Sequence, residues 1–550
     1  MRNLNKNFQL QLPQLCKGLA GYLVLLLCAC GSPQMKDDKK VFRYNEASGI
    51  STLDPLYASD RAVIWAVNML YDGLLRLDEN LHLQPAIARR WMLGDDALTY
   101  TFHLRDDVRF HDHPVFPEGK GRKVISSDFF YSFQRVMDRS EGSRGNWIFN
   151  SVDKSFGNDG MLTPDDTTFI IKLNTPLPAF PEMLSMPYCC VVPKEIVNHY
   201  GKEFRSNPVG TGPFRFFKWY EGVNLVFHKN EHYFMKNHNG EALPKLDAVM
   251  ISFIKDKQVA FLGFLRGEYH FQSGIDGSFK DELLNRNGGL KDKYQGKFKM
   301  LKGAYLNTEY LGMLTKEQAN NPLTNRKVRQ AINYAINRRE LVQYLRNGIG
   351  KPAEQGFIPY GLPAFDSTRQ GYSYQPQKAK ELLREAGYEG KNKLQIKLSI
   401  TPEYLDICEF IQQQLRAVGI QAEIDVNQPA TQREMVANSK VNFFRASWIA
   451  DYADAENYLA LFYSKNASPA GPNYTQFNHP TYDRWYEQAL RTPDAEKRKS
   501  IYARLDSIII SEAPVAVLFY DEWVRLIQNN VKNLHGNGMN LLDLRYADLD

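Results

Sequence analysis

Three short segments of the chain combine residue types that could bind an ion or a small molecule, and two of them are considered first. His111-Asp112-His113 could offer a transition metal two imidazoles and a carboxylate, but the segment lacks the distal ligands that zinc requires, so we expect a solvated loop. Gly210-Thr211-Gly212-Pro213 could cradle a phosphate only if it opened a helix, whereas Pro213 leads into an alternating, hairpin-like stretch. We expect these glycines to permit a tight crossing between domains, and we expect neither a metal nor a cofactor.

The third segment is Trp448-Ile449-Ala450-Asp451, which follows an apolar, strand-like stretch over 441–449. A carboxylate at the end of a strand can bind an ammonium group through charge-assisted hydrogen bonds, each contributing ~1.5 to 3 kcal/mol when water is excluded. An Asp after a strand is more often a turn residue, so the residue types alone leave both interpretations open. The chain carries no H-E-x-x-H, G-x-S-x-G or P-loop motif, and nothing in it argues for catalysis.

The N-terminus predicts export and a lipid anchor. Arg2, Lys6 and Lys17 precede the apolar run 19–27, which is shorter than the ~20 residues that span a bilayer. The run ends in Leu-Cys-Ala-Cys-Gly at 27–31, which resembles the bacterial lipobox. This resemblance implies that residues 1–29 are a signal peptide, that Cys30 carries the lipid, and that the polar stretch 30–40 is a flexible tether holding an extracytoplasmic body at a membrane. The alternative is a buried N-terminal helix with incidental cysteines.

Composition excludes several classes of partner and site. The formal charge of +6 falls to +3 without residues 1–29, and no Lys/Arg-rich block is present, which argues against a nucleic-acid partner. No second apolar segment is long enough to span a membrane. Cys189, Cys190 and Cys408 remain in the body, and their spacing indicates packed thiols rather than a disulfide scaffold or a metal site.

The elements that must position these residues predict a mixed α/β body. Residues 394–400 alternate as a strand, 401–419 have helical spacing between an N-cap and a C-terminal Gly, and 420–426 alternate again, which predicts a parallel β-α-β unit. The ligand crevice of such a sheet lies outside the carboxyl ends of its strands, hence after Ile400 and after the next strand. We also expect a hairpin over 214–229. Helices are expected over 327–345, 376–386 and 493–511.

Motifs along nearly the whole body resemble family 5 of the extracellular solute-binding proteins, the oligopeptide-, dipeptide- and nickel-binding group of ABC importers. The signature Asn-Pro-Val-Gly-Thr-Gly-Pro-Phe is at 207–214 and Val-Arg-Gln-Ala-Ile-Asn-Tyr-Ala-Ile is at 328–336. Further matching segments, in chain order between about residues 42 and 520, are 51–57, 70–75, 101–105, 110–112, 379–383, 386–388 and 450–452.

The resemblance implies a two-lobed periplasmic-binding-protein-like α/β fold that closes over its ligand by hinge motion. The expected N-terminal lobe is 41–305 with an extra subdomain at about 76–205, the C-terminal lobe is 306–515, and 516–550 return to the first lobe. The implied function is binding rather than turnover: a monomer captures a short peptide in the interlobe cleft and delivers it to an ABC-type import permease.

The resemblance also assigns ligand-binding residues. Asp451 matches the position that holds a peptide's α-ammonium, Trp448 would line the same pocket, and Arg445 matches an Arg that can pair with a peptide's C-terminal carboxylate. Strand alternation places residues 445 and 448 on opposite faces, so both reach one cleft only if the chain bends near Ser447.

Departures from the family pattern leave the ligand open. The chain has Met313-Leu314 where Phe-Asn is usual, Tyr269-His270 where the family has x-Asp, and His113 where Gly is usual. An alternative is therefore the same fold binding a metal chelate, heme or an oligosaccharide, and a further alternative is a surface enzyme or scaffold. Asp451→Asn would weaken peptide binding about tenfold or more and leave sugar binding largely intact.

Overall fold

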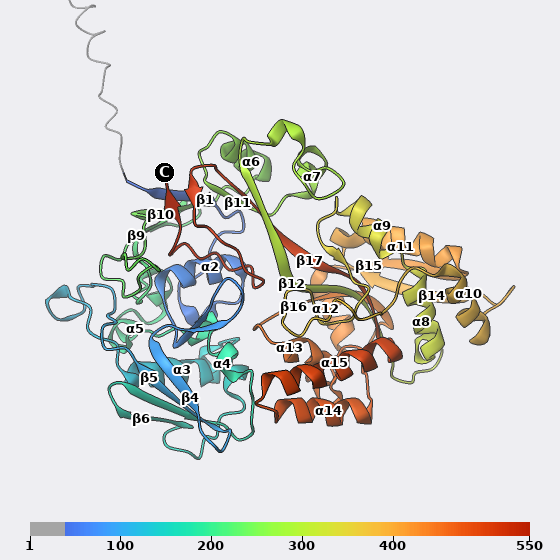
Figure 1. Ribbon diagram of the computed structural model, residues 1–550, viewed down its shortest axis with the longest axis horizontal. Helices are drawn as coiled ribbons and strands as arrows, with labels where there is room; N and C mark the ends of the chain where they lie inside the picture. Colours follow the sequence, from blue (N-terminus) through green and yellow to red (C-terminus); the bar gives the residue numbers. More distant parts are fainter. Residues whose placement is uncertain (1–38) are drawn as a thin grey trace, which may run out of the picture. The chain divides into compact units, whose positions relative to one another are not determined.

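A mixed sheet of eleven strands forms the framework of the protein. The computed structural model describes residues 39–550, and Cys30 with the predicted signal peptide lies outside them. Ten strands follow in the order β15-β14-β16-β12-β17-β11-β1-β10-β9-β8, and β13 pairs with β17 beside this path. The long antiparallel strands β12 and β17 join the two groups of strands and cross the middle of the molecule in Figure 1.

The strands of this sheet are β1 (Val41–Asn45), β8 (Phe214–Tyr220), β9 (Asn224–Lys229), β10 (Ala248–Ser252), β11 (Phe271–Ser273), β12 (Lys299–Met313), β13 (Lys351–Pro352), β14 (Leu394–Ile400), β15 (Ile420–Val426), β16 (Phe443–Ile449) and β17 (Val515–Ile527). A separate four-stranded sheet has the order β4-β5-β7-β6, from β4 (Ala88–Leu93), β5 (Thr99–Leu104), β6 (Met161–Asp165) and β7 (Thr168–Lys172). Two small sheets pair β2 (Leu75–Leu77) with β3 (Leu83–Pro85) and β18 (Val531–Lys532) with β19 (Asp548–Leu549).

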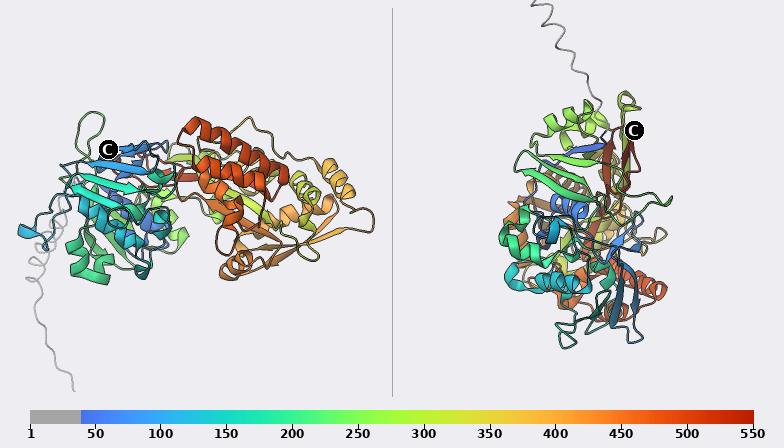
Figure 2. Two further views of the ribbon diagram at one scale, coloured as in Figure 1. Left: turned by 90° about the horizontal axis from the view of Figure 1, so that it is seen from below. Right: turned by 90° about the vertical axis from the view of Figure 1, so that its left-hand side faces the viewer.

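Helices pack on these sheets and bury their apolar faces against them. On the N-terminal side they are α2 (Arg61–Leu70), α3 (Ser126–Met137), α4 (Phe180–Met183), α5 (Lys194–Tyr200), α6 (Lys257–Leu265) and α7 (Gly277–Leu283). On the C-terminal side they are α8 (Arg326–Ala335), α9 (Arg338–Glu340), α10 (Pro376–Glu385), α11 (Leu405–Ala417), α12 (Pro429–Ala437), α13 (Glu456–Leu459), α14 (Pro480–Leu490) and α15 (Ala495–Glu512). Figure 2 shows α14 and α15 lying together on one side of their sheet.

Each lobe has its own apolar core. One large buried cluster joins α2, α3 and the four-stranded sheet, and a second joins α8, α11 and strands β14 and β15. A third cluster lies under α13, α14 and α15. Separate cores connected by long strands are the arrangement expected of two lobes that can move about a hinge.

The predicted β-α-β unit and hairpin are confirmed. β14 pairs parallel with β15 from Leu394↔Ile420 to Ile400↔Val426, with α11 as the crossover, and β14 also runs parallel to β16. β8 and β9 form the antiparallel hairpin. The expected helices at 376–386 and 493–511 correspond to α10 and α15.

The single helix expected over 327–345 is wrong, because the chain breaks after α8. Ile336 is extended, and the side chain of Asn337 accepts a hydrogen bond from the Glu340 amide and so starts α9, which continues as a π-helical turn over Leu341–Leu345. The backbone amide of Asn337 donates to Gln414 on α11. Apolar periodicity continues through such a break, since both pieces bury the same side, and therefore does not reveal it.

The glycine-rich motif at 210–213 forms a tight crossing, but it crosses the end of α2 within the N-terminal half of the chain instead of joining two domains, and it buries His111. A Cβ on Gly210 would lie 2.0 Å from the carbonyl oxygen of Leu70, so only glycine fits there. The Gly210 amide donates to His111 Nδ1, and Nε2 lies 3.0 Å from the carbonyl oxygen of Gly212. His111 is thus buried against the crossing instead of solvated, and burial lowers its pKa to about 4.

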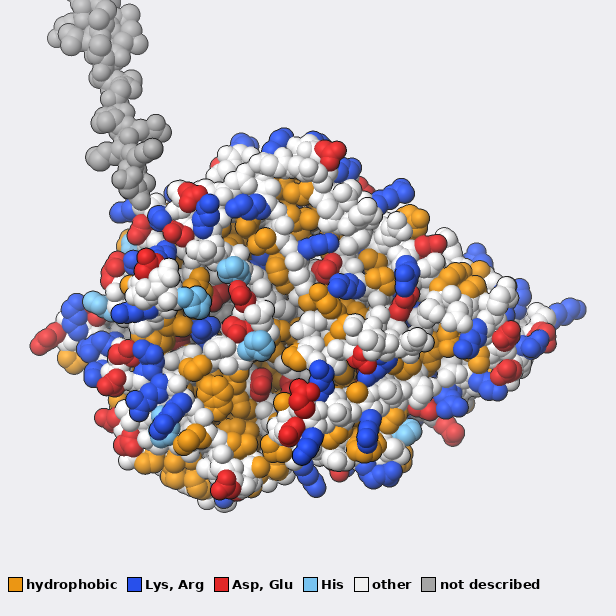
Figure 3. All heavy atoms as spheres, viewed as in Figure 1, with side chains coloured by type: hydrophobic (Ala, Val, Ile, Leu, Met, Phe, Trp, Pro, Cys, Tyr) orange, Lys and Arg blue, Asp and Glu red, His pale blue; other side chains and the backbone are white. Residues whose placement is uncertain are grey.

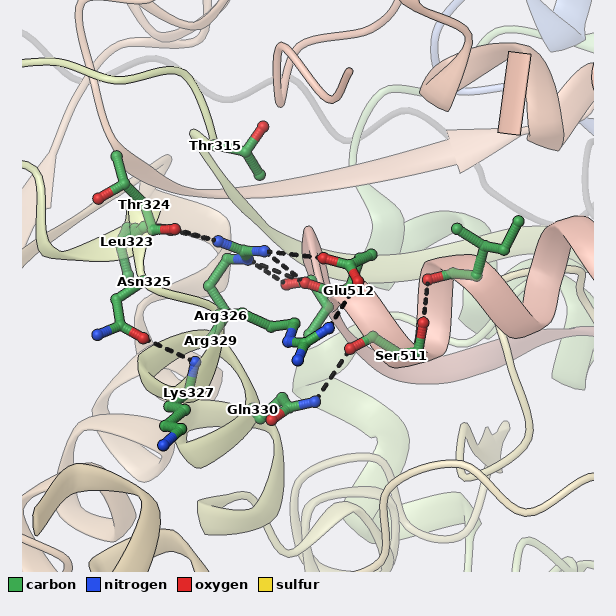
Figure 4. Close-up of polar contacts among 12 residues, drawn as sticks. Thr315, Leu323, Thr324, Asn325, Arg326, Lys327, Arg329, Gln330, Ser511 and Glu512 are labelled. Carbon is green, nitrogen blue, oxygen red and sulfur yellow. Dashed lines mark hydrogen bonds and ion pairs between the residues drawn. The ribbon is translucent and has the colours of Figure 1, made fainter. Parts of the chain in front are cut away.

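The arginine of the 328–336 motif has an architectural role (Figure 4). Arg329 is buried, and its guanidinium donates to the carbonyl oxygens of Leu323, Thr324, Glu512 and Ala513. The bonds to Glu512 and Ala513 satisfy carbonyls at the end of α15 that lack a partner within the helix, and those to Leu323 and Thr324 hold the turn that precedes α8. The motif therefore fixes α8 to α15.

Several sequence expectations concern groups that the structure places inside the body. Cys189, Cys190 and Cys408 are buried and form no disulfide among the described residues, and burial raises the pKa of the Cys408 thiol to about 12.

Within residues 39–550, no helix combines the length and apolar character of a membrane span. The face drawn in Figure 3 carries acidic and basic side chains interspersed.

Candidate functional site

The loop after β16 places Asp451 at the carboxyl edge of that strand, where the sequence predicts a ligand crevice. Its side chain is exposed, and in the described part of the chain no basic side chain forms an ion pair with it. Its contacts are with the side chain of Asn457 on α13: Asn457 Nδ2 donates to the Asp451 carboxylate at 3.3 Å, and the Asp451 backbone amide donates to Asn457 Oδ1 at 3.2 Å. The carboxylate is thus oriented but not neutralised.

Asn457 also fixes the tryptophan. The indole Nε1 of Trp448 donates to the same Asn457 oxygen at 2.9 Å, so one buried amide holds both residues. The structure therefore brings Trp448 and Asp451 together through Asn457, which belongs to none of the sequence motifs.

The surroundings of Asp451 oppose its charge. The carboxylate reaches solvent, yet protein atoms crowd it on its other sides, and this desolvation raises its pKa above the usual 3.8 although the Asn457 bond acts in the opposite direction. The exposed side chain of Asp451 can be reached by a ligand, whereas its raised pKa reflects the water that the charged carboxylate has lost to neighbouring protein atoms. A cationic group placed beside this carboxylate would compensate that loss.

The same loop meets the N-terminal part of the molecule. The ring of Tyr452 lies 6.0 Å, centroid to centroid, from the ring of Trp147, and it packs within the N-terminal core cluster. Burial, together with the charge of Asp451, raises the pKa of Tyr188 to about 12. Asp451 therefore lies where residues of both lobes come together.

Arg445 lies on the other face of β16. The register between β12 and β16 is continuous from Asn307↔Ile449 to Met313↔Phe443, so no bend near Ser447 brings residues 445 and 448 to one side. The guanidinium forms an ion pair with Glu309 and lies 3.1 Å above the ring of Tyr404, which follows the carboxyl end of β14. The structure thus groups Trp448 with Asp451 and separates Arg445 from both.

Sequence reasoning missed the partners that set these geometries. Asn457 and Glu309 have no motif of their own, and Trp147 and Tyr188 lie 304 and 263 residues before Asp451 in the chain. One signal was available: Tyr404 lies in the loop after Ile400, which the crevice rule selects. Within residues 39–550, no cluster of three or more His, Cys, Asp or Glu side chains could hold a metal ion.

Comparisons with known proteins identify the family. Residues 82–470 match the model for the bacterial extracellular solute-binding proteins, family 5. The glutathione-binding protein GsiB of Shigella dysenteriae serotype 1 is 28% identical over 496 residues, which cover 89% of this chain and 90% of GsiB.

Solved structures agree in fold. HbpA2 from Haemophilus parasuis superposes with a TM-score of 0.81 at 21% identity, covering 93% of this chain and 100% of HbpA2. The periplasmic binding protein DppA from Helicobacter pylori, in complex with the peptide STSA, superposes with a TM-score of 0.74 at 25% identity, covering 92% and 98%.

The chain belongs to family 5 of the bacterial extracellular solute-binding proteins, because the family model matches more than half of it. The two-lobed α/β fold expected from the sequence is confirmed. The protein is a binding component of an ABC importer that acts outside the cytoplasm, and not an enzyme.

Proposed function

We propose that this protein captures short peptides between its lobes and delivers them to an ABC-type import permease, with Asp451 binding the ligand's α-ammonium. The observation that carries the proposal is the state of Asp451: an exposed carboxylate, oriented by Asn457, without an ion-pair partner in residues 39–550 and held where the lobes meet. An ammonium group is the cation that a peptide offers at a fixed position relative to its first amide.

Trp448 supports this role by shape. Its indole nitrogen is occupied by Asn457, so its ring can offer the ligand only an apolar surface. A flat ring beside a carboxylate suits the first residue of a peptide, because the ring excludes water from the charged contact and so strengthens it. Arg445 could bind a ligand's carboxylate only after leaving Glu309.

The ligands named for two relatives support a peptide over a sugar. DppA binds the peptide STSA, and its resemblance to this chain supports peptides over uncharged oligosaccharides, which need no carboxylate partner. The GsiB name adds glutathione, which also carries an α-ammonium, to the ligands that such a site suits. The ligands of both relatives therefore agree with a carboxylate that binds the ligand's α-ammonium group.

Native mass spectrometry of residues 31–550, followed by denaturation and sequencing of the released material, tests the ligand class. We expect short peptides from the wild type and from the control Asp425→Asn, whose carboxylate is paired with Lys397, and a loss of peptides from Asp451→Asn. Release of a metal complex, heme or a sugar would overturn the peptide and keep the fold.

The membrane attachment is a separate part of the proposal. We infer that residues 1–29 are removed, that Cys30 is acylated and that a monomeric body is held outside the cytoplasm near its permease. Replacing Cys30 with Ser should move the full-length protein from the membrane fraction to the soluble fraction. Retention of Cys30→Ser on the membrane after a high-salt wash would contradict the lipid anchor.

A further inference from the structure

The N-terminal end of the large sheet has one face that packs on the core and one that reaches solvent. Strands β1, β10, β9 and β8 are neighbours there, and directly opposed side chains point to the same face. The inner rows, which pack in or against the N-terminal core, are Phe42-Val249-Phe227-Phe216 and Tyr44-Ile251-Leu225-Trp219. The opposite side, which we call the outer face, carries the rows Val41-Ala248-His228-Arg215, Arg43-Met250-Val226-Lys218 and Asn45-Ser252-Asn224-Tyr220. The right-hand view of Figure 2 looks toward this part of the molecule.

Large apolar side chains of the outer face are open to solvent at its β8–β9 hairpin. Phe217 and Tyr220 on β8 are 54% and 53% exposed, and Val223 in the turn that follows is 63% exposed. Phe217 is the extra residue of a bulge in β8, and its ring stacks on His228 with the centroids 4.0 Å apart. Aromatic rings gathered on one hairpin indicate a contact surface, in contrast to the single apolar residues that are scattered over any protein.

The charged side chains in the rows of the outer face are all basic. They are Arg43, Arg215 and Lys218, each exposed, and none of them forms an ion pair with a residue of the described chain. The acid in the neighbouring turn, Glu221, is paired with Arg205 at 3.0 Å. The outer face therefore combines exposed aromatic rings with cations that lack counterions within the described part of the protein.

This combination suits the interface of a bilayer. Aromatic rings are favoured at the level of the lipid headgroups, and Lys and Arg are attracted by anionic lipids. A second copy of the chain fits less well, because a symmetric contact would place the same cations of two molecules against one another. Charge complementarity thus favours an anionic membrane over self-association.

The start of the chain brings a membrane within reach of this face. Val41 belongs to the outer face, and Cys30, the proposed site of the lipid, lies 11 residues before it. A chain of that length spans at most ~40 Å when fully extended. Arg215 lies three strands from Val41 in the same row, a distance of roughly 14 Å at the usual strand spacing. A lipid on Cys30 would therefore keep the outer face close to the bilayer.

We propose that the outer face is a docking surface for an anionic phospholipid bilayer. The basic side chains attract the lipid headgroups, and Phe217, Tyr220 and Val223 enter the headgroup layer. The lipid on Cys30 attaches the protein, and the outer face orients it on the membrane. This inference draws on the proposed lipid anchor and does not depend on the peptide ligand.

The first test measures binding to vesicles without the lipid anchor. Residues 31–550, which lack Cys30, are sedimented with large unilamellar vesicles of phosphatidylcholine alone or mixed in equal parts with phosphatidylglycerol. We expect partition onto the phosphatidylglycerol vesicles to be at least tenfold stronger, and we expect high salt to abolish this preference because it screens exposed charges.

Paired variants locate the contact on the molecule. Arg215→Glu with Lys218→Glu should weaken partition onto phosphatidylglycerol vesicles at least tenfold, and Phe217→Ser with Tyr220→Ser should weaken it about fivefold. The matched control is Lys380→Glu with Arg384→Glu, which makes the same change of charge at two exposed positions of α10 in the other lobe. The control should stay within about twofold of the wild type. Circular dichroism confirms that each variant is folded.

A fluorescent probe tests the contact without removing charge. Tyr220→Cys is labelled with an environment-sensitive fluorophore, and Tyr374→Cys, at an exposed tyrosine of the other lobe, is the control. Because the other cysteines of residues 31–550 are buried, the label attaches at the introduced position. Phosphatidylglycerol vesicles should shift the emission to the blue at position 220 and leave it unchanged at position 374.

Three results would overturn the docking surface: a wild type that does not bind phosphatidylglycerol vesicles, an equal loss of binding in the α10 control, or a blue shift at 374 without one at 220. A wild-type dimer that Arg215→Glu with Lys218→Glu dissociates, together with no vesicle binding, would assign the face to a second copy instead. Asp451→Asn should bind vesicles as the wild type does, so a failure of the peptide function and a failure of this surface are distinguishable.

Discussion

Asp451 and Asp454 lie three residues apart in one loop, yet they differ in what surrounds them. Asp454 accepts hydrogen bonds from the Tyr502 hydroxyl at 2.7 Å and the Glu456 amide at 2.8 Å, and Arg498 lies 3.8 Å away. Asp451 is held by Asn457 alone and is exposed. The first carboxylate has all its partners within the protein and serves the fold, whereas the second lacks a cation, which a ligand could supply.

The largest predicted effect is the loss of stability when Asp454, the carboxylate that serves the fold, is removed. Asp454→Ala leaves the Tyr502 hydroxyl and the start of α13 without their acceptor in a mostly buried place, so we expect a loss of about 2 to 3 kcal/mol in the free energy of unfolding. Urea unfolding followed by circular dichroism measures it. Peptide affinity of the folded fraction should stay within about threefold of the wild type, and a selective loss of binding at full stability would erase the contrast with Asp451.

The ligand-facing acid should show the opposite pattern. Asp451→Asn retains the size of the side chain but removes its charge, so peptide affinity should fall at least tenfold, about 1.4 kcal/mol, in a calorimetric titration with trialanine. The free energy of unfolding should be unchanged or slightly higher, because a crowded charge is removed. A destabilised Asp451→Asn with normal affinity would assign both acids to the fold.

A smaller effect is expected at the tryptophan. Trp448→Phe keeps an aromatic ring but loses the indole bond that helps to hold Asn457, and therefore Asp451, in place. We expect a loss of about threefold to fivefold in trialanine affinity, equivalent to about 0.5 to 1 kcal/mol. Trp485→Phe, which alters a tryptophan on α14, is the matched control, and an equal loss there would remove the distinction.

The smallest effect is a pH dependence. Burial raises the pKa of Asp451 above 3.8, so on acidification the carboxylate takes up its proton at a higher pH than an ordinary Asp and trialanine affinity should decline accordingly. The same shift means that the folded state holds this proton more tightly than the unfolded state. Its stabilising effect is present below the unfolded pKa and is lost as the pH rises through the folded pKa.

Titrations from about pH 7 to about pH 4 measure this dependence, with Asp451→Asn as the control. We expect the decline in trialanine affinity on acidification to be absent from that variant. An equal decline in both proteins would place the titrating group elsewhere.

The sequence predicted those features that depend on local pattern. The alternation at 394–400 and 420–426 gave the parallel unit, and the strand period placed residues 445 and 448 on opposite faces, which the continuous β12–β16 register bears out. The break at Asn337 and the burial of His111 escaped it, because each depends on a partner far along the chain, Gln414 and the crossing at Gly210.

The site was only partly predictable for the same reason. Trp448 and Asp451 carry a motif, whereas Asn457 is an unremarkable helix residue until folding brings it under both. Glu309 lies 136 residues before Arg445, and no local pattern couples an acid in one strand to a base in another. Sequence motifs locate Trp448, Asp451 and Arg445. Hydrogen bonds and ion pairs with residues far along the chain determine which of these side chains can contact a ligand.

The most direct test is whether Asp451 binds the α-ammonium group of the ligand. Trialanine and N-acetyl-trialanine should be titrated calorimetrically into the wild type and into Asp451→Asn. We predict that acetylation, which removes the positive charge, weakens binding to the wild type at least tenfold and has little effect on the variant, because the two changes remove the same contact. A wild type that binds the acetylated peptide as tightly as the free amine would contradict the assignment of Asp451.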